Sequence, residues 1–109
     1  MQFQEYHFHI YFGPTSLSAA QEIVEKLQEF DYLDIGRVWN KPVGPHPIGS
    51  CQVTVKAAYF QKMCEWFLEH RNNLSIFIHA VTGDDLLDHT DYVMWIGDSY
   101  KINLAFFNK

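Results

Sequence analysis

The clearest pattern in the chain is the alternation of apolar and other side chains from Phe3 to Phe12. Successive residues of an extended chain point to opposite sides, so alternation over this length predicts a β-strand. One side of this strand carries Phe8, Ile10 and Phe12, and the other carries His7, His9 and Tyr11. Gly13 and Pro14 end the strand. The pattern therefore predicts one face for a core and one face of imidazole and phenol groups.

The rest of the chain alternates between the helical and the extended period. Apolar residues recur every three or four positions over 16–30 and 57–70, which predicts two amphipathic helices. Residues 33–39, 48–56 and 74–79 read as strands, whereas three prolines and a glycine in 41–47 exclude regular structure there. Residues 92–96 indicate either a short extra strand or a helical turn. The tail over 102–107 is apolar enough to dock on the domain.

The order of these elements, βαββαβ, predicts an α+β fold of one domain over residues 1–109. Right-handed crossovers turn this order into a ferredoxin-like sandwich, with an antiparallel sheet of order 4-1-3-2 and a C-terminal extension. Both helices then cover one face of the sheet, and His7 and His9 lie on the other. That face is open unless a second subunit or the C-terminal segment covers it. Because it is apolar and aromatic, we expect a homodimer.

Composition narrows the classes of function. The 109 residues have a formal charge of −5, with only eight Lys and Arg and no basic cluster, which argues against binding nucleic acid. No apolar run approaches the roughly 20 residues that span a bilayer, so we expect no membrane association. Two cysteines without C-x-x-C spacing are typical of reduced thiols in a cytoplasmic protein. Six histidines and eighteen aromatic residues (nine Phe, six Tyr, three Trp) exceed what a core needs.

Three histidines form the first candidate site, a metal centre. His7 and His9 lie two residues apart on one strand face, so both imidazoles can reach one ion. His79 ends the fourth strand, which should pair antiparallel with the first and bring this third ring close to His7. The alternative for such a pair is a solvated or dimer-interface position.

Two further histidines are candidates for contact with a substrate. His46 lies in the proline-rich loop, where it is either a plain turn residue or a substrate-facing imidazole. His89 lies in the acidic segment 88–91, which is either an N-capping cluster or a setting that fixes the charge or tautomer of the ring. Cys51 and Cys64 fall on apolar faces, so we expect inert thiols.

Four blocks of sequence carry a resemblance to a known family: HFHIYF at 7–12, GPHPI at 44–48, LSIFIHAVTG at 74–83, and DHTD at 88–91 followed by WIG at 95–97. Together they resemble the DOPA 4,5-dioxygenase family, the small fungal type that has bacterial relatives. The resemblance covers most of the chain, from Tyr6 to Gly97. One departure is Ala80, which follows His79 where the family often has proline.

The resemblance implies extradiol cleavage of L-DOPA or a related catechol by O2 at a non-haem Fe(II) centre, which Zn or Ni can replace in a purified sample. We predict that His7, His9 and His79 hold the metal and that His46 and His89 are catalytic. The predicted substrate contacts are Tyr11, Arg37, Arg71 and Trp95, the arginines being suited to the carboxylate of an amino acid. Whether a carboxylate completes the metal shell stays open among Glu5, Asp88 and Asp91.

Two other functions compete with the dioxygenase. The first is a non-catalytic ferredoxin-like dimer that binds a metal or a small aromatic ligand. The second is a cofactor-free monooxygenase of the dimeric α+β barrel type, which needs no metal.

Overall fold

The structure, a computed structural model, describes residues 3–108. Its elements are β1 (Glu5–Phe12), α1 (Leu17–Leu27), β2 (Asp34–Trp39), β3 (Gly49–Lys56), α2 (Phe60–His70), β4 (Ser75–Ala80), α3 (Asp85–Asp88) and β5 (Val93–Ile96), with short 3-10 helices η1 (Ala57–Tyr59) and η2 (Leu104–Phe107). Among the described residues, no helix is long and apolar enough to cross a membrane.

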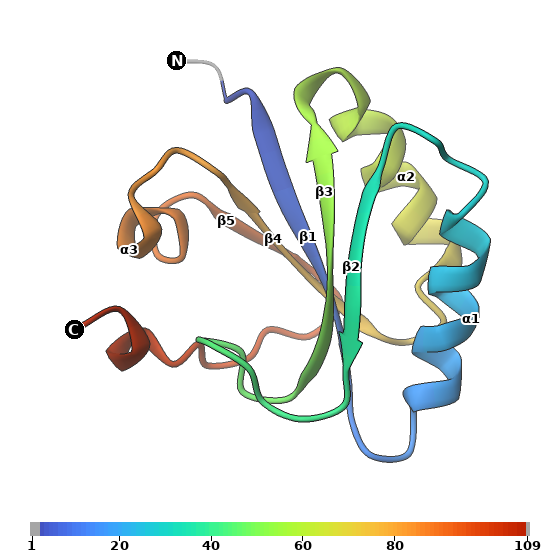
Figure 1. Cartoon of the computed structure of the whole chain (residues 1–109), viewed down its shortest axis with the longest axis horizontal. Helices are drawn as coiled ribbons and strands as arrows, with labels where there is room; N and C mark the ends of the chain where they lie inside the picture. The colour runs from blue at the N-terminus through green and yellow to red at the C-terminus, as the bar shows by residue number, and fades with distance from the viewer. Residues whose placement is uncertain (1–2, 109) are drawn as a thin grey trace.

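The strands form one antiparallel sheet in the order β2-β3-β1-β4-β5. The predicted order 4-1-3-2 is therefore confirmed, and the segment predicted as a strand or a turn is the edge strand β5. Helices α1 and α2 cover the same face of the sheet, as predicted (Figure 1). The ferredoxin-like α+β arrangement places β1 in the centre, hydrogen-bonded to β3 on one side and β4 on the other.

The core lies between the sheet and these two helices, because each element turns its apolar side inward. Phe8 of β1 pairs with Val53 of β3 and with Ile78 of β4, so apolar residues meet on one face across three strands. The same face packs under buried residues of both helices, namely Ala20, Ile23, Leu27, Met63 and Phe67. Helix α1 ends three residues before the predicted position. Residues 28–30 continue as a turn in which the Phe30 N–H donates to the Leu27 carbonyl over 3.0 Å.

The other face of the sheet is covered by the chain itself. The loop between β2 and β3, helix α3 and the C-terminal segment lie on this side (Figure 1). The loop and the tail are joined by a hydrogen bond of 2.9 Å from the Asn103 N–H to the Pro45 carbonyl. The Phe106 ring packs beside Gly44 in the same loop. This cover removes the reason for expecting a second subunit on this face, and the homodimer stays a prediction.

Candidate functional site

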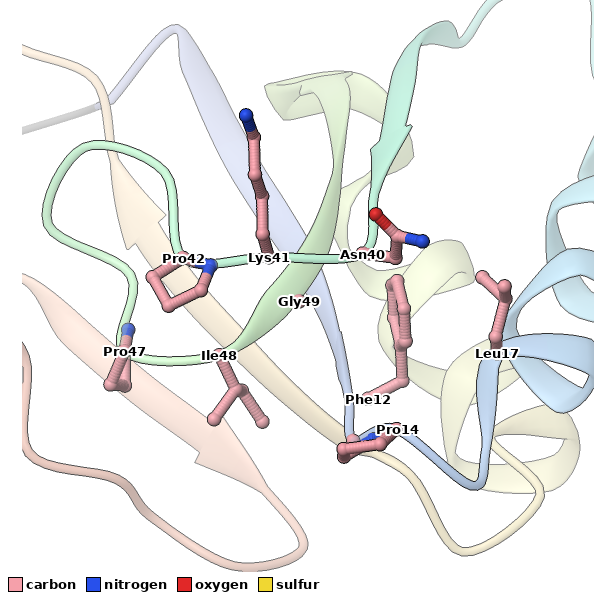
Figure 2. A pocket seen from close by; sticks show the side chains of 10 residues that line it. Phe12, Pro14, Leu17, Asn40, Lys41, Pro42, Pro47, Ile48 and Gly49 are labelled. Carbon is pink, nitrogen blue, oxygen red and sulfur yellow. The ribbon is translucent and has the colours of Figure 1, made fainter.

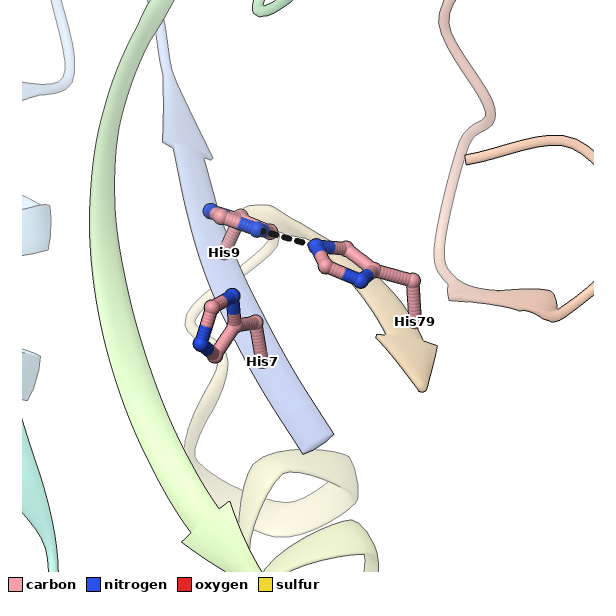
Figure 3. A group of neighbouring side chains, drawn as sticks. All are labelled: His7, His9 and His79. Atoms are coloured by element: carbon pink, nitrogen blue, oxygen red, sulfur yellow. Dashed lines mark hydrogen bonds between the residues drawn. The ribbon is translucent and has the colours of Figure 1, made fainter. Parts of the chain in front are cut away.

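The three predicted metal ligands meet on the covered face of the sheet. His7 pairs directly with His79 across β1 and β4, and His9 lies two residues further along β1 (Figure 3). The Nε2 atoms of His9 and His79 are 2.9 Å apart. One nitrogen from each of the three rings lies within 4.8 Å of the others. The regular register of β1, which has no bulge against either neighbour, sets this convergence.

The donor set fits a divalent transition metal. With metal–nitrogen bonds of about 2.1 Å, two imidazole ligands at right angles have their nitrogens about 3.0 Å apart. The 2.9 Å between His9 and His79 matches that spacing. His79 also donates its Nδ1–H to the Ala80 carbonyl over 2.8 Å, so its Nε2 lone pair faces the other rings. A backbone partner of this kind fixes the tautomer of a metal-binding histidine.

Burial keeps these imidazoles uncharged. It lowers the pKa of His7, and it lowers the pKa of His9 well below the usual value, with the neighbouring imidazoles acting in the same direction. Burial also lowers the pKa of His79 to about 4, against a weaker opposite effect of its bond to the Ala80 carbonyl. Near pH 7 the rings are therefore neutral, which is the form that coordinates a metal.

The group of described ligand atoms contains no carboxylate. Asp88 is buried, but both of its oxygens are used by Thr82, whose backbone N–H and hydroxyl donate to them over 2.8 and 2.5 Å. Asp91 is exposed. Glu5 follows the strand parity of His7 but is outside the group. Among the described residues, the candidate metal centre thus consists of three imidazoles and no carboxylate.

A cavity of about 220 Å³ opens onto the three histidines. His46 and His89 also line it, from the loop and from the end of α3. The His46 ring lies 4.2 Å from that of His9, and the His89 ring 4.1 Å from that of His79. Its other lining residues are Pro45, Gln52, Val81, Asp85, Asp88 and Phe107. The structure therefore brings together all five histidines that the sequence singled out.

The four predicted substrate contacts lie outside this lining. Tyr11 is buried behind His46, with its hydroxyl 2.7 Å from His46 Nδ1. Trp95 is stacked on Phe77, with 4.6 Å between ring centroids. Arg37 lies over the Trp39 ring on edge strand β2, and Arg71 donates to the Leu74 carbonyl over 2.9 Å, just before β4 begins. Their role as substrate contacts stays a prediction.

Gln52 and Phe107 are among the lining residues that the sequence did not single out. Gln52 pairs with His9 in the register of β1 and β3, and its amide lies 3.5 Å from His7 Nε2. Its alternation with Cys51 and Val53 was the signal that it shares the histidine face. Phe107 comes from the apolar tail, with its ring 4.7 Å from that of His89. The apolarity of the tail predicted that it docks, but nothing in the sequence indicated where.

A second cavity, of about 340 Å³, lies at the other end of β1 (Figure 2). Pro42 and Pro47 line it, whereas Pro45 of the same loop lines the histidine cavity. Its described lining is largely apolar, with Lys41 as the charged member, and it contains no histidine, cysteine or carboxylate. Of these two cavities, the first is the one lined by histidine and carboxylate side chains.

Comparisons with known proteins identify the family that the chain matches. The sequence matches the Dopa 4,5-dioxygenase family over residues 6–106. It is 34% identical to a DOPA 4,5-dioxygenase of Amanita muscaria, an alignment that covers 95% of this chain and 50% of that protein. It is 30% identical to an uncharacterized 21.2 kDa protein of Botryotinia fuckeliana, over 94% of this chain and 61% of that one. The chain thus spans between half and two thirds of the length of these relatives.

Among solved structures, the chain resembles a crystal structure from Nostoc punctiforme that is described as a candidate dioxygenase. The TM-score is 0.92 and the sequence identity is 34%. The match covers 97% of this chain and 92% of the other. The fold is therefore shared over nearly the full length of both chains.

Proposed function

This chain belongs to the Dopa 4,5-dioxygenase family, and from that premise we propose that it is an extradiol dioxygenase that opens the ring of L-DOPA or a related catechol. The proposal includes non-haem Fe(II) as the metal and O2 as the second substrate. The observation that carries it is the convergence of His7, His9 and His79 beside a cavity that two further histidines line.

The three neutral imidazoles would hold the metal. Bound there, Fe(II) supplies open positions through which a catecholate and O2 exchange electron density. Zn(II), which has no redox chemistry, would occupy the same nitrogens without supporting this electron transfer. The side chains around the metal must bind the catechol ring, exclude water and move protons at the catechol oxygens.

The cavity suits a substrate with one aromatic ring. Its volume of about 220 Å³ is below the roughly 300–1,000 Å³ of sites for drug-sized ligands. Phe107 lines one side of it, and the side chains of His9 and His79 are nearly removed from water, at 2% and 3% exposed. Exclusion of water strengthens each hydrogen bond to the bound catechol. His46 and His89, on two sides of the metal ligands, are in position to contact its oxygens.

The test is a comparison of metals and atmospheres. The protein is stripped with a chelator and reloaded with Fe(II) or with Zn(II), and L-DOPA is added under air or under argon. We expect a yellow ring-opened product only with Fe(II) under air. Activity that survives chelation would instead favour a cofactor-free monooxygenase. If the Fe(II)-loaded protein leaves every catechol untouched under air, the dioxygenase proposal fails and a metal-binding or ligand-binding role takes its place.

A further inference from the structure

The two histidines that line the cavity outside the metal group, His46 and His89, have different hydrogen-bond partners at Nδ1. We infer that His46 and His89 are held in opposite tautomers, so that the cavity offers an N–H donor from His46 and a lone pair from His89. Tyr11 is then a positioning residue that fixes the donor. The catalytic meaning of this inference rests on the proposed function, but the tautomers themselves can be measured without turnover.

His89 has its proton on Nδ1. That nitrogen lies 2.7 Å from the carbonyl oxygen of Asp85, four residues earlier in the chain. A carbonyl can only accept a hydrogen bond, so Nδ1 must donate. In the neutral ring, Nε2 then carries the lone pair, and the ring lines the cavity. His89 is therefore an acceptor toward a bound ligand.

His46 has the reverse arrangement because of Tyr11. The Tyr11 hydroxyl lies 2.7 Å from His46 Nδ1, and Tyr11 is only 1% exposed. Within the described residues, this nitrogen is the one acceptor that the hydroxyl has. A buried hydroxyl hydrogen without an acceptor costs about 1–3 kcal/mol, so Tyr11 donates and Nδ1 accepts. With Nδ1 accepting, the neutral ring carries its proton on Nε2.

The Nε2–H of His46 is free to meet a ligand. No hydrogen bond to this nitrogen is found among the described residues, yet every buried side-chain nitrogen and oxygen there has a partner. Nε2 of His46 is therefore accessible, and the cavity is what this ring lines. His46 and His89 line the same cavity.

The two rings then have separate roles. His89 takes the proton of a catechol hydroxyl: the O–H bond breaks, an N–H bond forms at Nε2, and the catechol becomes an anion while the ring becomes a cation. His46 donates a hydrogen bond to an anionic oxygen of the catecholate and keeps its proton, because a neutral imidazole is a very weak acid. A neutral histidine that acts as a hydrogen-bond donor stabilises charge as it develops.

The first experiment reads the tautomers by NMR. Long-range proton–nitrogen spectra of the histidine-labelled chain, metal-free and loaded with Zn(II), distinguish the protonated from the bare nitrogen of each ring. We expect Nε2–H for His46 and Nδ1–H for His89. In Tyr11→Phe, the Nδ1 signal of His46 should move because its lone pair loses the hydrogen bond. Tyr100→Phe, which changes a neighbour of the Tyr11 ring, should leave the signal in place. Nδ1–H on His46 in the unmodified chain would overturn the inference.

The second experiment separates donation from proton transfer. Glutamine retains an N–H donor but cannot accept and return a proton. In the Fe(II)-loaded enzyme, His46→Gln should keep kcat within about tenfold of the unmodified chain, whereas His46→Ala should lose about 100-fold. At the other position, His89→Gln should lose about as much as His89→Ala, roughly 100-fold or more. Equal losses in His46→Gln and His46→Ala would refute the donor role. If the tautomers are as stated and no catechol is opened, the proposed function fails and the tautomers stand.

Discussion

Acidification of the metal-free protein should destabilise it through the buried imidazoles. Burial lowers the pKa values of His46 and His79 to about 4, whereas histidine in an unfolded chain titrates near 6.5. Between these two values the unfolded chain binds more protons than the folded one. The free energy of unfolding therefore rises with pH in this range, and stability that is complete above pH 6.5 is lost as the pH falls toward 4.

The magnitude follows from these two pKa values. For a ring that shifts from 6.5 to about 4, the free energy of unfolding at pH 5 is about 2 kcal/mol lower than at pH 8. His46 and His79 together give about 4 kcal/mol, and His9, whose pKa is also lowered, acts in the same direction. A loss of this size is a large part of the roughly 5–15 kcal/mol that stabilises a domain.

Denaturant unfolding of the metal-free chain at a series of pH values measures this loss. The variant His46→Gln lacks one of the titrating rings. Between pH 8 and pH 5, the free energy of unfolding should therefore fall by about 2 kcal/mol less in this variant than in the unmodified chain. Tyr100→Phe, which leaves every histidine in place, should keep the full dependence. A stability that is flat between pH 8 and pH 5, or an equal fall in His46→Gln, would refute the reasoning.

Three other predictions concern the metal, the buried acid and the substrate. His79→Ala should weaken Zn(II) binding about 100-fold or more in equilibrium dialysis, because it removes a ligand; His70→Ala, in which a ring stacked on Trp66 is lost, should not. Asp88→Ala should lower the free energy of unfolding by about 2 kcal/mol in denaturant titration, because Thr82 loses both acceptors, whereas exposed Asp91→Ala should not. The Fe(II)-loaded enzyme should open a catechol with an aminoethyl group faster than one with a carboxyethyl group, because the described lining includes Asp85 and no Lys or Arg. The reverse order of kcat/KM would contradict the last prediction.

The parts of the fold that depend on periodicity could be predicted from the sequence. Alternation along β1 separated Phe8 from His9, and the order of elements placed β4 beside β1. Those two facts were enough to bring His79 to His7, because antiparallel pairing fixes which residues face each other. The metal group was therefore within reach of sequence reasoning, although its occupancy stays a prediction.

The cover of the histidine face could not be predicted in the same way. It depends on single contacts between distant segments, such as the bond from Asn103 to Pro45, and such contacts leave no periodic trace. The same cover buries Tyr11, which the alternation alone placed on an open face. The positions of the arginines could not be predicted from the sequence either. Their charge suggested that Arg37 and Arg71 bind a carboxylate, but the structure places both outside the lining of the cavity.

The cluster of buried imidazoles is difficult to explain as a device for stability. Apolar side chains at His9 and His79 would fill the same space without the cost of desolvating polar rings and without acid sensitivity. The chain instead covers these rings with a proline-rich loop and with a tail that ends at Phe107, and it uses Tyr11 and Asp85 to hold two further rings in place. A metal that binds the neutral imidazoles of the folded chain offsets their cost, because it stabilises only the state that presents all three nitrogens together. Zn(II) should therefore raise the midpoint of denaturant unfolding at pH 8 in the unmodified chain and much less in His79→Ala, which lacks one of the three nitrogens. An equal increase in both chains would show that the metal binds elsewhere.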